Sequence, residues 1–181
     1  AKLLGTGAIK FGSPDLIILN SGGPATHLAE NSMLCGPANM RVVIRQPEGM
    51  PVTEPNNALE GKLEFLGETP TLTAELEEWK HGCWYHSNII SAAGLGDLMN
   101  KLTQITPELK FHTEHRGLPK GAFWTGSVAY DMIQWTQPIA LTKQPGNNAI
   151  LAVLWLIEDF IVHNNTTDEF SVYGSNKDWT E

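Results

Sequence analysis

The last third of the chain constrains the fold most strongly, because short apolar segments alternate there with polar turns. The residues Asn164–Asp168 are polar and turn-forming, and the segments on either side of them alternate apolar with polar side chains. This pattern predicts a β-hairpin spanning Phe160–Tyr173. We expect four strands in this part of the chain, at Ala122–Tyr130, Ala149–Ile157, Phe160–His163 and Phe170–Tyr173.

Further strands are predicted in the amino-terminal part of the chain. Leu16–Leu19 is an apolar run closed by Asn20–Pro24, whose glycines and proline prevent the strand from continuing. Met40–Arg45 contains three consecutive β-branched residues, which suit a pleated sheet. Residues 46–58 carry three prolines and predict an irregular connection, and Lys62–Phe65 predicts another short strand.

The hydrophobic period changes after this connection. Leu72, Leu76 and Trp79 stand at i, i+4 and i+7 with glutamates between them, as in an amphipathic helix. Thr71 or Thr73 is a candidate amino-terminal cap. This spacing predicts a helix over residues 72–79.

A second helix is predicted before residue 107. Leu98, Leu102 and Ile105 share one face of a helix, and Asp97 stands at its start, where a carboxylate can satisfy free amides. Pro107 ends the pattern because proline cannot continue a helix. Strands, two helices and strands again indicate an α+β fold with mostly antiparallel β sheets and a few short flanking helices.

Composition narrows the class of protein. At 181 residues and 41% hydrophobic, the chain can bury one sizeable core, and we expect a single domain over residues 1–181. Its net charge is −8 and its 12 basic residues are scattered, so we expect no nucleic-acid partner. The longest apolar run, Ala149–Ile157, is shorter than a membrane span, and the amino terminus lacks a secretory pattern. These features predict a cytoplasmic protein without a membrane partner.

Histidine pairs are the first candidates for a metal site. His81 and His86 form one local pair, and His112 and His115 form another. Neither pair has a recognised ligand spacing, and the second would diverge on a strand. We expect solvated or core histidines and no metal ligand, with a metal-dependent enzyme as an alternative.

Other catalytic motifs are incomplete. Gly5–Gly7 lacks the third glycine of a dinucleotide fingerprint and predicts a turn, and Gly126–Ser127 lacks the second glycine of a nucleophile elbow. Two cysteines, Cys35 and Cys83, cannot form a zinc site by themselves, and we expect both to be reduced and buried. No catalytic residue is assigned from these patterns.

The segment Pro119–Asp131 stands out from the rest of the chain. It reads as a strand whose small residues let another backbone approach closely. It ends in the pair Tyr130–Asp131 at a chain reversal, where a tyrosine can bury its ring while its hydroxyl reaches a polar partner. The small residues are Gly121, Ala122, Gly126 and Ala129.

This segment resembles one in the large subunits of anthranilate synthase and aminodeoxychorismate synthase. Late in their amino-terminal domain these subunits carry the pattern P-F-x-G-G-x-x-G-x-x-x-Y-D, followed by apolar strands and a turn. The chain matches the pattern at Pro119, Gly126, Tyr130 and Asp131, with the same spacing. The double glycine of the family is Ala122–Phe123 here.

The resemblance implies a two-sheet β assembly with flanking helices. It also implies a non-catalytic, structural or regulatory domain of a lyase that forms anthranilate or aminodeoxychorismate from chorismate. The catalytic domain, which binds chorismate and magnesium, would follow Glu181, and the tryptophan-binding segment would precede Leu3. No catalytic residue and no cofactor are therefore expected in this chain. The implied partners are that catalytic domain and a glutaminase subunit.

An alternative is a stand-alone small-molecule or protein binding domain with an aromatic-lined pocket. Six tryptophans are many for a chain of this length, and Trp124, Trp135 and Trp155 lie in the predicted β region. We expect these side chains to fill the core, because tryptophan is strongly buried on average.

Overall fold

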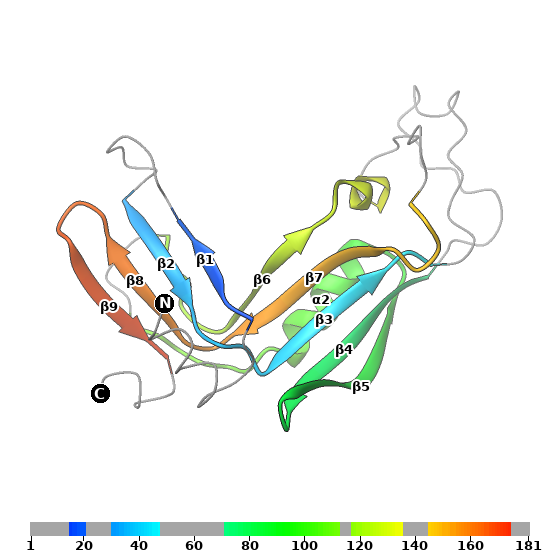
Figure 1. Ribbon diagram of the computed structural model, residues 1–181, viewed down its shortest axis with the longest axis horizontal. Coiled ribbons are helices and arrows are strands. Elements are labelled where there is room, and N and C mark those ends of the chain that lie inside the picture. The colour runs from blue at the N-terminus through cyan, green and yellow to red at the C-terminus, as the bar shows by residue number, and fades with distance from the viewer. Residues whose placement is uncertain (1–14, 21–29, 48–70, 113–116, 136–144, 175–181) are drawn as a thin grey trace.

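The computed structural model describes residues 15–20, 30–47, 71–112, 117–135 and 145–174. Two antiparallel sheets, the helix α2 and a 3₁₀ helix, η2, make up this part of the chain (Figure 1). The predicted α+β class with mostly antiparallel sheets is confirmed. The predicted strand Lys62–Phe65, the turn Gly5–Gly7 and His115 lie outside the described residues.

The first sheet has four strands in the order β1-β2-β8-β9. Its strands are β1 (Ile17–Leu19), β2 (Asn31–Cys35), β8 (Phe160–Asn164) and β9 (Glu169–Tyr173). The predicted hairpin is confirmed, since β8 and β9 pair directly. Its turn is stabilised by Asn164, whose side-chain oxygen accepts hydrogen bonds from the backbone amides of Thr166 and Thr167.

The second sheet has five strands in the order β5-β4-β3-β7-β6. Its strands are β3 (Met40–Arg45), β4 (Leu72–Lys80), β5 (Cys83–Ala92), β6 (Phe123–Val128) and β7 (Ile150–Ile157). The two sheets meet where β2 leads into β3 and β7 leads into β8, and they diverge from there (Figure 1). Glu158 and Asp159 make the second of these crossings.

The predicted helix over residues 72–79 is wrong, because this segment is the strand β4. The spacing from Leu72 to Leu76 is four residues, which fits one face of a helix and equally one face of a strand. In the sheet, Leu72, Ala74 and Leu76 all face the core. Glu75 and Glu77 point to the opposite face, where they pair with arginines of β3.

The strand β5, which the sequence did not indicate, completes a long hairpin with β4. The two strands are joined by His81 and Gly82, which have φ angles of 51° and 80°. Two consecutive positive φ values are typical of the tight turns that match the twist of a hairpin. Beside the turn, Trp79 packs edge to face against Trp84.

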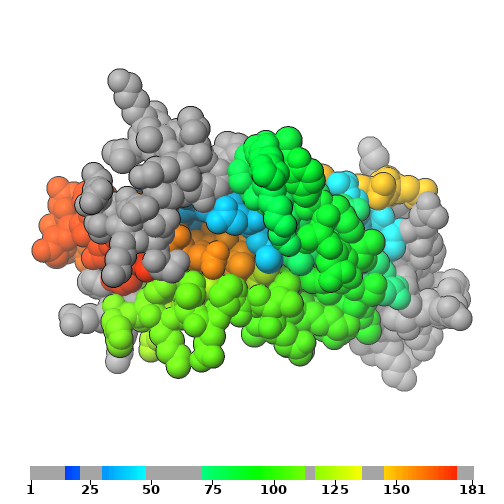
Figure 2. Space-filling view, turned by 90° about the horizontal axis from the view of Figure 1, so that it is seen from below, coloured from blue at the N-terminus to red at the C-terminus, as the bar shows by residue number. Residues whose placement is uncertain are grey.

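The helix α2 (Leu95–Ile105) confirms the second helix prediction. Leu98 and Leu102 are fully buried, and they hold α2 against the five-stranded sheet. Asp97 lies in the first turn, but its carboxylate accepts a hydrogen bond from the amide of Ala93, ahead of the helix. Figure 2 shows residues 72–112 (green) covering much of the face seen from below, with β3 (cyan) in a strip beside them.

The described core consists of two clusters. The larger cluster lies between the five-stranded sheet, α2 and η2 (Tyr130–Trp135). The smaller cluster surrounds Phe160, whose ring makes edge contacts with Phe111 and Phe123 and stacks on Tyr173. The tryptophans that we expected to fill the core are only partly buried. Trp124 and Trp135 pack against the larger cluster, and Trp155 packs against the smaller one. None of the described helices has the length and apolar character needed to cross a bilayer.

Candidate functional site

The Pro119–Asp131 segment forms β6 and the start of η2. Pro119 is half-buried just before the strand, Gly126 is exposed within it, and Tyr130 and Asp131 begin η2. The tyrosine ring is not buried as the sequence suggested, since Tyr130 is 74% exposed. The 3₁₀ turn directs the ring outward while Met132, two residues later, fills the core.

The small residues of this segment permit the close backbone packing that the sequence predicted. A Cβ atom at Gly126 would collide with the carbonyl oxygen of Val153 and would lie 3.0 Å from the Cα atom of Leu154. A Cβ atom at Gly121 would collide with the carbonyl oxygen of Leu109. Both glycines therefore allow a neighbouring chain segment to approach more closely than any other residue would.

A separate group of polar and aromatic side chains converges on Asp15, two residues before β1. The Oδ2 atom of Asp15 accepts three hydrogen bonds, from Arg41 Nη1 at 3.2 Å, Trp84 Nε1 at 3.1 Å and Trp155 Nε1 at 3.0 Å. We call these four residues the Asp15 cluster. Its three donors come from β3, β5 and β7, so the cluster connects the segment ahead of the four-stranded sheet to the five-stranded sheet.

Arg41 is the centre of the Asp15 cluster. Its Nε atom donates to the carboxylate of Glu77, and its guanidinium lies 4.4 Å from the ring centroid of Trp84. The side chains of Arg41 and Asp15 are 23% and 30% exposed, so water screens their ion pair only in part. A planar guanidinium suits this position because it can bind carboxylates at its edge and an aromatic ring on its face.

Strand register brings these residues together. Arg41 pairs with Glu77 on one side and with Trp155 on the other, so all three side chains lie on the same face of the sheet. We call it the polar face, and the face that packs against α2 the apolar face. Asp15 and Trp155 are 140 positions apart in the chain, and no local motif joins them. The arginines of β3 and the glutamates of β4 have opposite charges, and they could have indicated the ion pairs if residues 72–80 had been assigned as a strand.

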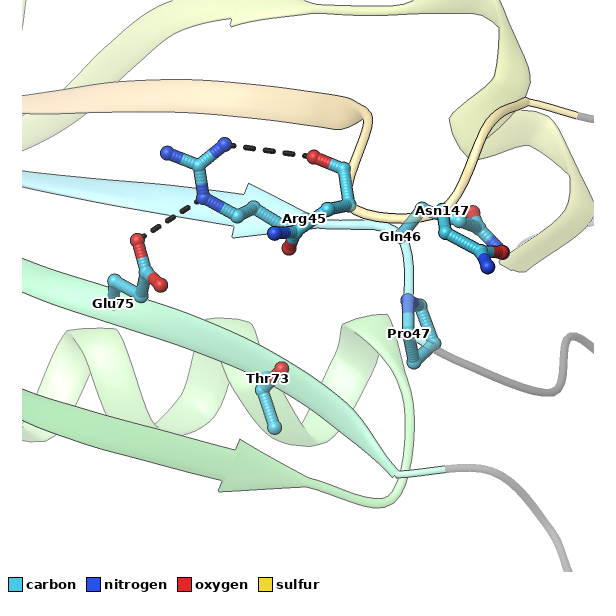
Figure 3. A pocket seen from close by; sticks show the side chains of 7 residues that line it. Arg45, Gln46, Pro47, Thr73, Glu75 and Asn147 are labelled. Atoms are coloured by element: carbon cyan, nitrogen blue, oxygen red, sulfur yellow. Dashed lines mark hydrogen bonds and ion pairs between the residues drawn. The ribbon is translucent and has the colours of Figure 1, made fainter.

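A polar pocket of about 370 Å³ lies at the ends of β3 and β4 (Figure 3). Arg45 lines it, with its Nε atom donating to Glu75 at 3.1 Å and its Nη1 atom directed at the carbonyl oxygen of Asn148 at 3.5 Å. Its described lining is Arg45, Gln46, Pro47, Thr73, Glu75, Asn147 and Asn148. The Oε1 atom of Gln46 is buried, and no residue in the described ranges donates a hydrogen bond to it.

Burial, charge and hydrogen bonds shift the pKa values of several groups outside the Asp15 cluster and the polar pocket. Burial raises the pKa of the Cys35 thiol to about 11, which keeps it protonated and poorly nucleophilic at neutral pH. Burial, with the charge of Asp159 as a second cause, raises the pKa of Glu158. The Lys101 ammonium and the Ala93 amide lower the pKa of Asp97.

The cysteines and histidines have separate surroundings. Cys35 is buried as predicted, whereas Cys83 is exposed beside the β4–β5 turn, where the chain leaves the sheet. His81 lies in that turn and His86 pairs across the sheet with Glu77. Within the described ranges, no three His, Cys, Asp or Glu side chains are grouped as a cation site requires.

Comparison with protein-family models, with characterised proteins and with solved structures gives no match.

Proposed function

We propose that this chain is the amino-terminal, non-catalytic domain of a chorismate-using lyase. The whole enzyme would form anthranilate or aminodeoxychorismate from chorismate and ammonia. The observation that carries this proposal is the order of Pro119 ahead of β6, Gly126 in β6, and Tyr130 and Asp131 in η2, followed by β7 and the β8–β9 hairpin. This is the order of motif, apolar strands and turn on which the resemblance rests. The two-sheet α+β architecture supports the same proposal.

The domain would have a structural or regulatory role in the cytoplasm. Its partners would be the magnesium-binding catalytic domain of the same enzyme and a glutaminase subunit. An exposed apolar group at the end of β6 and the start of β7 supports contact with another domain, because Val128 is 62%, Tyr130 74% and Ile150 50% exposed. A hydrogen bond from the Ala129 amide to the Leu151 carbonyl keeps these two segments together.

The test compares this chain with its natural coding region. We expect no conversion of chorismate by the 181-residue protein supplied with magnesium and ammonium. We also expect the coding region to continue into a chorismate-binding segment whose addition gives turnover. Lyase activity in the 181-residue protein, or a stop codon after Glu181, would contradict the proposal.

The second candidate function is a small-molecule or protein binding domain. The observation that favours it is the gathering of Trp84 and Trp155 around Arg41, with Trp79 packed against Trp84. A titration of the intrinsic tryptophan fluorescence with candidate ligands tests it. A saturable change supports binding at these side chains, and a fluorescence that stays constant across a ligand series argues that they serve packing alone.

A further inference from the structure

The acceptor in the Asp15 cluster is supplied by a different part of the fold from its donors. Arg41, Trp84 and Trp155 project from three strands of one sheet, and strand pairing fixes their spacing. Asp15 belongs to the short segment that leads into β1, in the other sheet. The donors are therefore positioned by the sheet and not by Asp15 itself.

The three N–H donors of the Asp15 cluster are more than one carboxylate oxygen can accept with good geometry. All three hydrogen bonds reach Oδ2 of Asp15, although a carboxylate oxygen offers about two lone-pair sites. Among the described residues, no hydrogen bond is directed to Oδ1. A carboxylate that entered freely could place one oxygen between the two indole N–H groups and the other on the guanidinium, which presents its donors as a planar fork.

We propose that Arg41, Trp84 and Trp155 form a carboxylate-binding site that Asp15 fills from within the chain, and that a small-molecule carboxylate competes with Asp15 for it. The inference does not depend on the proposed lyase function. Glu77 still accepts a hydrogen bond from Nε of Arg41 when Asp15 leaves, and strand pairing still positions Trp84 and Trp155. Binding of a carboxylate is coupled to release of Asp15 from the five-stranded sheet.

The test removes the internal carboxylate and offers a free one. The variant Asp15→Ala is labelled with ¹⁵N and titrated with sodium formate, with sodium chloride at the same ionic strength as the reference. Among the indole N–H signals of the six tryptophans, those of Trp84 and Trp155 should shift saturably with formate only. The variants Trp84→Phe and Trp155→Phe assign the two signals. A purely structural role for Asp15 would not give this response.

Two comparisons measure the competition. In wild-type protein the same two signals should respond at a formate concentration at least about tenfold higher, because Asp15 is an intramolecular competitor. In the double variant Asp15→Ala/Arg41→Met the affinity should fall at least about tenfold, because the charge-assisted bond is lost. Asp97→Ala is the matched control, since it removes a bonded carboxylate outside the cluster and should respond like wild type.

Thermal unfolding gives an independent readout. Asp15→Ala should have a lower Tm than wild type, and formate should restore part of the loss saturably while chloride does not. If this variant does not fold, Asp15→Asn takes its place and should show a lower half-saturating formate concentration than wild type. Folded Asp15 variants whose Trp84 and Trp155 signals do not respond to formate, or respond no more strongly than in wild type, would overturn the proposal.

Discussion

The apolar face of the five-stranded sheet is stabilised differently from the polar face. The larger buried cluster, between this sheet, α2 and η2, contains only apolar side chains, among them Val42, Leu72 and Leu98. The polar face carries Arg41, Glu77 and other charged or aromatic residues joined by specific hydrogen bonds. Burial of apolar surface stabilises in proportion to area and has no preferred direction, whereas ion pairs and indole hydrogen bonds require a defined register. We therefore expect the apolar face to contribute more to stability and the polar face to determine which polar groups meet.

The largest expected effect is on the apolar face. Leu98→Ala should lower the free energy of unfolding by about 2–5 kcal/mol, because it leaves a cavity under a fully buried side chain. Urea denaturation followed by circular dichroism measures this. The control is Met99→Ala on the exposed side of the same helix, which should change the value by less than about 1 kcal/mol. Equal effects at the two positions would mean that α2 does not cover the sheet as described.

The second largest expected effect on stability is at the contact between β6 and β7, two neighbouring strands of this sheet. Gly126→Ala should lower the free energy of unfolding by about 1–3 kcal/mol, since its Cβ atom would collide with the backbone of Val153 and force the strands apart. Gly96→Ala in α2 is the control, because a Cβ atom there meets nothing within 4 Å and alanine favours the helix. A neutral result at Gly126 would show that β6 pairs with β7 less closely than described.

A smaller effect is expected on the polar face. Arg41→Met should lower the free energy of unfolding by about 1–2 kcal/mol, because the Asp15 and Glu77 carboxylates both lose their cation. Arg45→Met, which removes a single, more exposed ion pair, should cost less than about 1 kcal/mol. Chemical denaturation of the two variants at low and high salt compares them, and equal losses would contradict the central role of Arg41.

The smallest expected effect on stability concerns Glu158, the residue that follows β7. Burial raises the pKa of Glu158, so the folded state favours its protonated form. The resulting stabilisation is present below the ordinary pKa of about 4.5 and is lost as the pH rises through the higher native value. Glu158→Gln should therefore have a higher Tm than wild type at pH 7 and a similar Tm below pH of about 4.

Glu108→Gln is the matched control for this measurement, because Glu108 is highly exposed. It should leave the Tm unchanged at both pH values. A difference between Glu158→Gln and wild type that grows as the pH falls would contradict the assigned sign.

Local pattern was sufficient for part of the fold. The Phe160–Tyr173 hairpin, the strand at Met40–Arg45 and the helix ending before Pro107 were all predicted, because turn residues and a proline marked their boundaries. The strand β4 was mistaken for a helix, because a spacing of four residues fits both periods. The strand β5 was missed because most of its side chains are exposed at the edge of the sheet and show no apolar alternation.

The candidate site was less accessible to sequence reasoning. Gly126 and Gly121 were correctly predicted to permit close backbone packing, because glycine has few other reasons to occupy a strand. The Asp15 cluster was not predicted, since its members are spread from residue 15 to residue 155. The donors are brought together because β3 pairs with both β4 and β7, and the sequence of a single segment does not specify that pairing.

The sequence by itself determined that this chain forms a mostly antiparallel α+β fold, with a strand inside Pro119–Asp131 whose glycines permit close packing; in the structure this strand is Phe123–Val128. Those features follow from steric and turn preferences that act over a few residues. Only the tertiary structure decided that Tyr130 faces solvent and that Asp15 meets Arg41, Trp84 and Trp155. The physical reason is that strand order and register, which are set by the packing of the whole sheet, choose the long-range neighbours of each side chain.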